Sequence, residues 1–100
     1  MLTEKDYCDY GLLRSLIEIG YPKYRILDTG FRILLYEAHK WLREEKGLHI
    51  EIDRVGYDWL VSVIETKNNL CLAVKNRCQS YEEALLEGVR ASIKLLKEEK

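Results

Sequence analysis

The spacing of apolar side chains predicts a helix at the start of the chain. Residues 3–20 carry apolar side chains one helical turn apart, at Cys8, Leu12, Leu16 and Ile19. Thr3 and Asp6 have the spacing of a loose capping box at the N-terminal end, and Gly20 supplies the C-terminal stop.

A second helical pattern covers residues 34–46. Its apolar stripe contains Leu34, Leu35, Ala38, Trp41 and Leu42, and charged side chains occupy the opposite face. Gly47 ends this helix.

The segment between these two helices has two interpretations. Two short apolar stretches, 24–27 and 31–34, flank Asp28-Thr29-Gly30, which fits a small β-hairpin with Gly30 in a left-handed turn. Alternatively, Thr29 caps an early start of the following helix, because Phe31 continues its period. We favour the hairpin, and the pattern leaves both open.

After Gly47 the period changes from helical to alternating. Leu48, Ile50 and Ile52 alternate with polar residues, which predicts a half-buried strand. Residues 57–66 and 70–76 predict two more strands, joined by turns so short that neighbours must run antiparallel. The last strand is the most apolar, so we expect it to be central or covered on both faces.

The chain closes with a helix from Ser80 onward. Ser80 and Glu83 form a capping box. The predicted buried stripe consists of Tyr81, Leu85, Val89, Ser92, Ile93 and Leu96. Gly88 interrupts this stripe, which indicates a close approach of the helix to the sheet.

These elements predict a single α+β domain over residues 1–100, with helices packed on one face of a three-stranded antiparallel sheet. The expected order is helix, hairpin, helix, three strands, helix. So small a sheet leaves edges and a second face to bury, and we therefore expect a homodimer. The candidate interfaces are strand 57–66 or 70–76 at an edge, or an exposed stripe of helix 34–46.

Composition adds limits on location and partners. The 100 residues carry a net charge of -1, which lacks the overall positive charge typical of nucleic-acid-binding proteins. No apolar run approaches the ~20 residues that span a bilayer, and the N-terminus is too charged for a signal peptide, so we expect a cytoplasmic protein without membrane contact. The odd number of cysteines, Cys8, Cys71 and Cys78, argues against a disulfide framework.

Candidate chemistry has simpler structural explanations. Asp28-Thr29-Gly30 resembles the catalytic tripeptide of aspartic proteases, but the helical segments do not fit that all-β fold, and Asp and Gly are common turn residues. His39 and His49 lack further metal ligands at suitable spacing. Trp41 and Trp59 fall among core positions. We therefore predict no catalytic, cofactor-binding or metal-binding residue, and no enzyme.

From residue 35 onward the predicted order matches that of double-stranded-RNA-binding domains. Those domains need cations at the start of the last helix, where this chain has Glu82 and Glu83, which repel phosphate. A local basic patch would consist of Arg32, Lys40, Arg43 and Lys46.

Two family resemblances follow. The stretches MLTEKDYCDY, LYEAHKWLREEKGLHIEI and SYEEALLEGVRASIKLL resemble a group of small uncharacterised Bacteroidetes proteins, often encoded in prophages or mobile elements. This resemblance implies an α+β homodimer and no catalytic residue. Residues 49–96, with SYEEALLEGVRASI, are similar in pattern to HicB-type antitoxins, although the proline-glycine segment and the DNA-binding segment of that family are missing.

Three functions follow as hypotheses. The first is a homodimeric, non-enzymatic interaction module of phage or mobile-element origin. The second is a HicB-like antitoxin that masks a small toxin. The third is a nucleic-acid-binding accessory protein that uses the basic patch.

Overall fold

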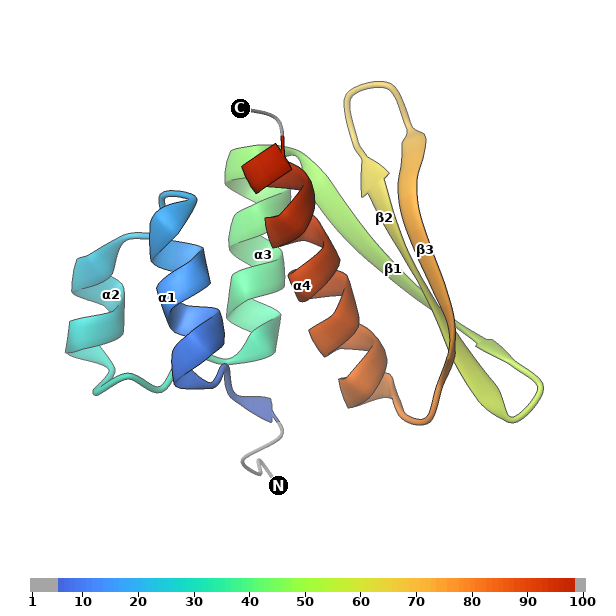
Figure 1. Ribbon diagram of the computed structural model, residues 1–100, viewed down its shortest axis with the longest axis horizontal. Helices are drawn as coiled ribbons and strands as arrows, with labels where there is room; N and C mark the ends of the chain where they lie inside the picture. The colour runs from blue at the N-terminus through green and yellow to red at the C-terminus, as the bar shows by residue number, and fades with distance from the viewer. Residues whose placement is uncertain (1–5, 99–100) are drawn as a thin grey trace.

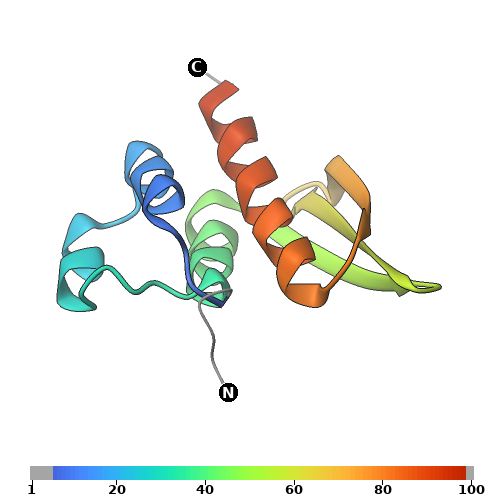
Figure 2. The same ribbon diagram turned by 60° about the horizontal axis from the view of Figure 1, so that its bottom comes forward.

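The computed structural model describes residues 6–98, which form an α+β fold with one open sheet (Figure 1). The elements follow in the order α1 (Tyr10–Glu18), α2 (Lys23–Asp28), α3 (Leu35–Lys46), β1 (Leu48–Val55), β2 (Asp58–Glu65), β3 (Leu70–Cys78) and α4 (Tyr81–Glu98). Helices α3 and α4 pack beside and against the sheet, and α1 and α2 lie on their other side (Figure 2). The predicted fold class is confirmed.

Helix α1 begins later than the sequence pattern indicated. Asp9 is its N-cap, and its side chain accepts a hydrogen bond from the Leu12 N–H at 2.8 Å. Of the predicted capping pair, Thr3 lies outside the described residues and Asp6 precedes the helix. The predicted apolar stripe is nevertheless buried at Cys8, Leu12 and Leu16, which all lie in the core.

The predicted hairpin around residues 24–34 is wrong, because α2 occupies its first half. Pro22 is the N-cap, with an extended backbone (φ -61°, ψ 119°), and Ile26 is the buried side chain of this short helix. The Thr29 hydroxyl donates to the Arg25 carbonyl at 2.9 Å, and Gly30 follows with a φ of 65°. Asp28-Thr29-Gly30 is therefore the end of a helix and its turn, and Thr29 does not cap α3.

The segment after that turn runs back along the N-terminal residues. The Cys8 N–H donates to the Ile33 carbonyl at 2.7 Å, and Tyr7 forms an isolated antiparallel bridge with Leu34. Ile33 is fully buried. This contact holds both ends of the α1–α2 segment against the rest of the core.

Helix α3 and its junction with β1 agree with the sequence prediction. The apolar stripe buries Leu35, Ala38, Trp41 and Leu42. Gly47 ends the helix in a left-handed conformation with a φ of 67°, which glycine adopts at little cost. The Trp41 ring packs edge-on against Tyr21, with centroids 5.2 Å apart, which confirms its core position.

The sheet is an antiparallel meander in the order β1-β2-β3. In the register, Ile50 pairs with Val63 and Ile52 with Val61, and these side chains face the helices. The expectation that residues 70–76 form a central or doubly covered strand is wrong. The central strand is β2, and β3 is an edge strand whose Leu70, Leu72 and Val74 are 52%, 38% and 59% exposed.

Helix α4 crosses the sheet at close range. A Cβ atom built on Gly88 would lie 2.5 Å from Ile50 Cγ2, which confirms the predicted close approach. The Glu83 N–H donates to the Ser80 hydroxyl at 3.1 Å, and the Glu83 carboxylate accepts from the Gln79 N–H at 2.7 Å, so the cap is present as predicted. Tyr81 departs from the predicted stripe, because it is 49% exposed.

Candidate interaction surface

The most distinctive surface of the molecule is the face of the sheet that points away from α4, here called the outer face. Alternation along the strands and the observed register assign ten side chains to it: His49, Glu51, Asp53, Val55, Asp58, Leu60, Ser62, Ile64, Cys71 and Val74. No described helix lies over this face in either ribbon view. Within residues 6–98, the sheet is thus packed on one side only.

The outer face has an apolar centre. Leu60 and Ile64 on β2 are half-buried by their neighbours alone, and Val74 on β3 is 59% exposed. At the end of the sheet, Val55 is 58% exposed. Exposed apolar side chains that are contiguous on a regular surface are typical of protein contacts.

Acidic side chains border this centre on the β1 side. Glu51 and Asp53 alternate with the inward-facing Ile50 and Ile52, and both carboxylates are exposed. On the helix side of the same sheet, Lys75 forms an ion pair with α4: its Nζ lies 3.1 Å from a carboxylate oxygen of Glu87.

The two histidines lie together at the start of β1. Their ring centroids are 5.2 Å apart, and His39 Nε2 accepts a hydrogen bond from the Ile50 N–H at 3.2 Å. Burial, followed by the nearby His49 and Arg43, lowers the pKa of His39 to about 4. His39 is thus half-buried at the margin of the apolar stripe of α3 and accepts a backbone hydrogen bond from β1.

The cysteines differ sharply in environment. Burial raises the pKa of Cys8 to about 12, with smaller contributions from Asp9 and Glu37. Burial also raises the pKa of Cys78, whereas Cys71 is exposed on the outer face. A thiolate nucleophile is therefore unfavourable at the two buried positions.

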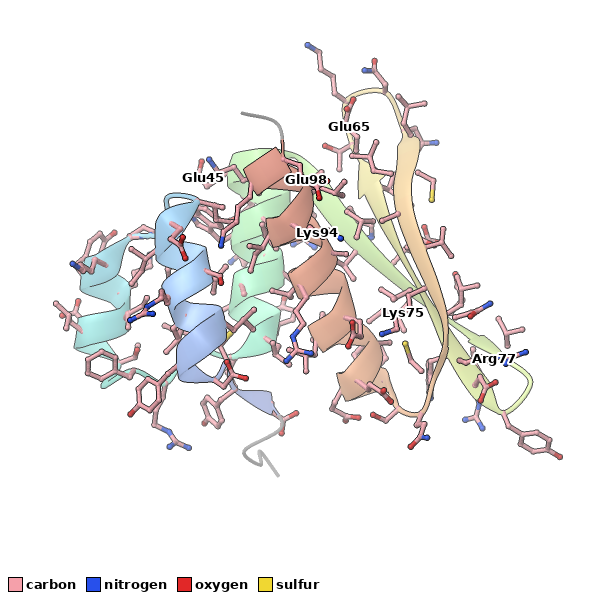
Figure 3. The ribbon with its side chains drawn as sticks, viewed as in Figure 1. Glu45, Glu65, Lys75, Arg77, Lys94 and Glu98 are labelled. Atoms are coloured by element: carbon pink, nitrogen blue, oxygen red, sulfur yellow. The ribbon has the colours of Figure 1, made fainter. Side chains whose placement is uncertain are left out.

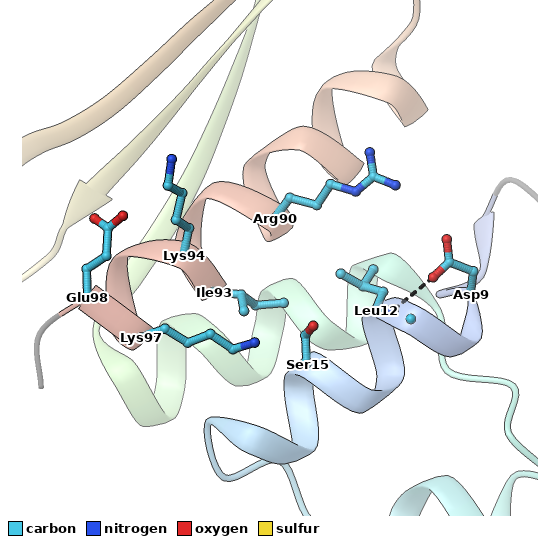
Figure 4. A pocket seen from close by; sticks show the side chains of 9 residues that line it. Asp9, Leu12, Ser15, Arg90, Ile93, Lys94, Lys97 and Glu98 are labelled. Carbon is cyan, nitrogen blue, oxygen red and sulfur yellow. Dashed lines mark hydrogen bonds between the residues drawn. The ribbon is translucent and has the colours of Figure 1, made fainter.

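A groove of about 670 Å³ runs between α1 and α4 (Figure 4). Three of the charged side chains that line it have partners within the chain. Asp9 caps α1, Lys97 Nζ lies 3.3 Å from Glu18 Oε1, and Arg90 lies 3.5 Å from Glu87. We therefore assign this groove to the packing of two helices.

The cations proposed as a basic patch do not converge on one spot. Arg32 precedes α3 and stacks over the Tyr7 ring at 4.3 Å, while Lys46 ends α3 and lies over the Trp41 ring at 5.6 Å. Arg43 is half-buried and Lys40 is exposed between these ends. Lys40, Arg43 and Lys46 thus lie along α3, and Arg32 lies before it.

Sequence patterns missed part of this surface. Leu60 and Arg77 were not singled out, although the alternation of Leu60, Ser62 and Ile64 already separates one face of residues 58–65 from the other. Within residues 6–98 no cluster of three or more His, Cys, Asp or Glu side chains is placed to hold a metal ion. No described helix is both long and apolar enough to cross a bilayer.

No protein-family model, curated protein or solved structure matches this chain. The resemblances to the Bacteroidetes proteins and to HicB-type antitoxins therefore stay predictions.

Proposed function

We propose that this chain is a non-enzymatic interaction module that works as a homodimer and uses the outer face of its sheet as the contact. One observation carries the proposal: the three-stranded sheet has helices on one face, while the other presents Leu60, Ile64 and Val74 to water. Sheets of this kind are stabilised by a layer on each apolar face. A second copy supplies that layer.

The most strongly perturbed titratable groups support a non-enzymatic role. His39 holds a backbone N–H of β1, and Cys8 is a core side chain that donates its backbone N–H to Ile33. Each shifted pKa is accounted for by burial in the folded chain, and such structural causes also perturb pKa values away from catalytic sites. The resemblance to mobile-element proteins is consistent with a small accessory module.

The test is light scattering coupled to gel filtration, from about 1 to 500 μM protein, so that a weak dimer is visible. We expect a dimer at the upper end and a monomer for Leu60→Lys, whose charge would be placed in the apolar centre. Leu27→Lys is the matched control, because Leu27 is 60% exposed on α2, at the other end of the molecule (Figure 1). A wild-type protein that stays monomeric over this range would refute the proposal.

A HicB-like regulator is the second candidate. It is favoured by the order β1, β2, β3, α4 with the Ser80–Glu83 cap, the features on which that resemblance rests. Affinity purification of the tagged chain from its host, followed by mass spectrometry, separates the candidates. A stoichiometric small partner favours the regulator, and self-association without such a partner favours the homodimer.

A further inference from the structure

The outer face carries opposite charges at the same level of its two edges. Asp53 on β1 pairs with Leu60 on β2. Between Trp59 and Val61 the register with β3 shifts, from Cys78 to Lys75, so that Asn76 and Arg77 together lie opposite Leu60. An acid, an apolar side chain and a base thus follow one another across the strands.

The side chain of Arg77 lies on the outer side of the sheet. Figure 3 shows it directed away from α4, on the opposite side of β3 from Lys75. The backbone of Arg77 is left-handed, with a φ of 59°, at the register shift described above. This local irregularity breaks the simple alternation of side chains along β3. The base is therefore presented on the same face as Asp53 and Leu60.

Edge-to-edge pairing through β3 is disfavoured by the same irregularities. Register shifts occur at Trp59/Val61 and at Val63/Ile64, on both sides of Ala73–Lys75. Bulges and lysine on an edge strand are devices that prevent addition of another strand. The strand predicted at residues 57–66 was also a candidate edge for the interface. It is the central strand β2 and has no free edge. Among the strand surfaces considered, the outer face is the larger regular surface, and we take it as the contact.

We propose that two copies stack outer face to outer face about a two-fold axis that runs parallel to the strands above β2. This orientation rests on the proposed homodimer and specifies it. The axis exchanges the β1 and β3 sides while keeping the level along the strands, so Asp53 of each copy lies against Arg77 of the other, and Leu60 lies against Leu60. Packed sheets are about 10 Å apart, a gap that Asp and Arg side chains span together.

The alternative two-fold axis, perpendicular to the strands above Ser62, places β1 over β1. Glu51 would then face Glu51 of the second copy, and like charges placed opposite one another are destabilising. Rotation about the parallel axis places Asp58 over Asp58, also one like-charge pair, but it forms the Asp53–Arg77 contact twice. With the like-charge pairs equal in number, the two Asp53–Arg77 contacts favour the parallel axis.

The size of the face sets the expected affinity. Strands about 4.8 Å apart with a rise of about 3.3 Å per residue make this face roughly 400 Å² per copy. Two copies bury about 800 Å² by this measure, less than the ~1,200 Å² of most stable complexes. The estimated area therefore places this contact among the weak, transient interfaces.

The test is a charge-swap cycle measured by sedimentation equilibrium. Asp53→Arg and Arg77→Asp each create two like-charge contacts, and we expect each to weaken the dimer about tenfold. The double variant restores both pairs with reversed sign and should bind within about threefold of wild type. Asp tolerates the left-handed backbone of position 77 better than most residues do. Asp28→Arg is the matched control at the far end of α2 and should leave the affinity unchanged.

The outcomes separate this orientation from the proposed function. Rescue in the double variant supports the parallel axis. A second outcome is that Leu60→Lys dissociates the dimer but the double variant does not recover the affinity lost in the single charge variants. The outer face would then be the interface, and this orientation would be wrong. A wild-type monomer at all concentrations overturns both.

Discussion

His39 Nε2 accepts the hydrogen bond of the Ile50 N–H, at 3.2 Å, and so joins α3 to the outer edge of β1. Because this N–H is bonded to His39, it points to the side of β1 away from β2. The bond requires an unprotonated Nε2, which places the proton of the neutral ring on Nδ1. Protonation of the ring therefore competes directly with this contact.

This contact predicts a loss of stability in acid. The pKa of His39 is about 4 in the folded chain, against 6.5 for an unperturbed histidine, so the unfolded state binds the proton more strongly. The contribution is complete above pH 6.5 and is lost as the pH falls toward 4. Because the ring is only half-buried, we expect a loss of roughly 1–2 kcal/mol in the free energy of unfolding.

Urea unfolding at several pH values measures this effect. His39→Gln keeps an acceptor for the Ile50 N–H but does not titrate, so its stability should change less between pH 7 and 5. His49→Gln should retain most of the wild-type dependence, because burial is the larger cause of the His39 shift. Equal pH dependence in wild type and His39→Gln would contradict the assignment.

Gly88 and Gly11 should respond in opposite directions to alanine. A methyl group on Gly88 meets Ile50 Cγ2 and, at 3.0 Å, Val61 Cγ2, both on stiff β-branched side chains in the core. Overpacking outweighs the gain in helix propensity, and we expect Gly88→Ala to destabilise by about 1–2 kcal/mol.

Gly11 provides the control for this prediction. Its nearest neighbour would be Asp9 Oδ1 at 3.5 Å, an ordinary contact, and its position in α1 is exposed. Gly11→Ala should therefore raise stability by about 0.5–1 kcal/mol. Thermal unfolding of both variants checks the pair, and a stable Gly88→Ala would mean that α4 lies farther from the sheet.

The N-cap of α4 should make a measurable contribution. Ser80→Ala removes the acceptor of the Glu83 N–H, and we expect a loss of about 1 kcal/mol. Ser15→Ala, within α1, tests the same chemical change inside a helix and should be neutral or slightly stabilising. If both variants lose the same stability, the cap does not explain the effect.

Thiol labelling should distinguish the three cysteines. Cys71 is exposed, whereas Cys8 and Cys78 are 5% and 1% exposed and have raised pKa values. A disulfide reagent at pH 8 should react rapidly with one thiol per native chain and with the other two only on unfolding. Cys71→Ser should abolish the rapid phase. Fast labelling in that variant would show that the core opens more readily than its packing indicates.

The parts of the fold that sequence patterns predicted are those with a long local signal. Helix α3 shows more than two turns of apolar period and a C-terminal glycine, and α4 adds a capping box. The β1–β3 segments alternate or stay apolar between short polar turns. Their antiparallel order then follows from connections too short for a crossover.

The errors lie where context outweighs local pattern. Helix α2 has six residues and no side-chain cap, too few for a period to be measured, and it is held by the burial of Ile26 and by the preceding Tyr21 against Trp41. The β3 segment was predicted to be central or covered on both faces because its sequence is apolar. Its edge position follows from pairing with β2, and its exposed apolar side chains are instead the best indication of a contact surface.

The edge of β1 has a further consequence for how this sheet behaves at high concentration. Growth of cross-β fibrils requires that each added chain expose a new edge for the next one. Here α3 occupies the first part of the outer edge of β1, leaving only Ile52–Val55 as a short docking segment, and the irregular β3 closes much of the opposite edge. We therefore expect strand addition to stop after one round. The contact of His39 with β1 and the two register shifts along β3 would then limit fibril growth, although the strands expose many apolar side chains.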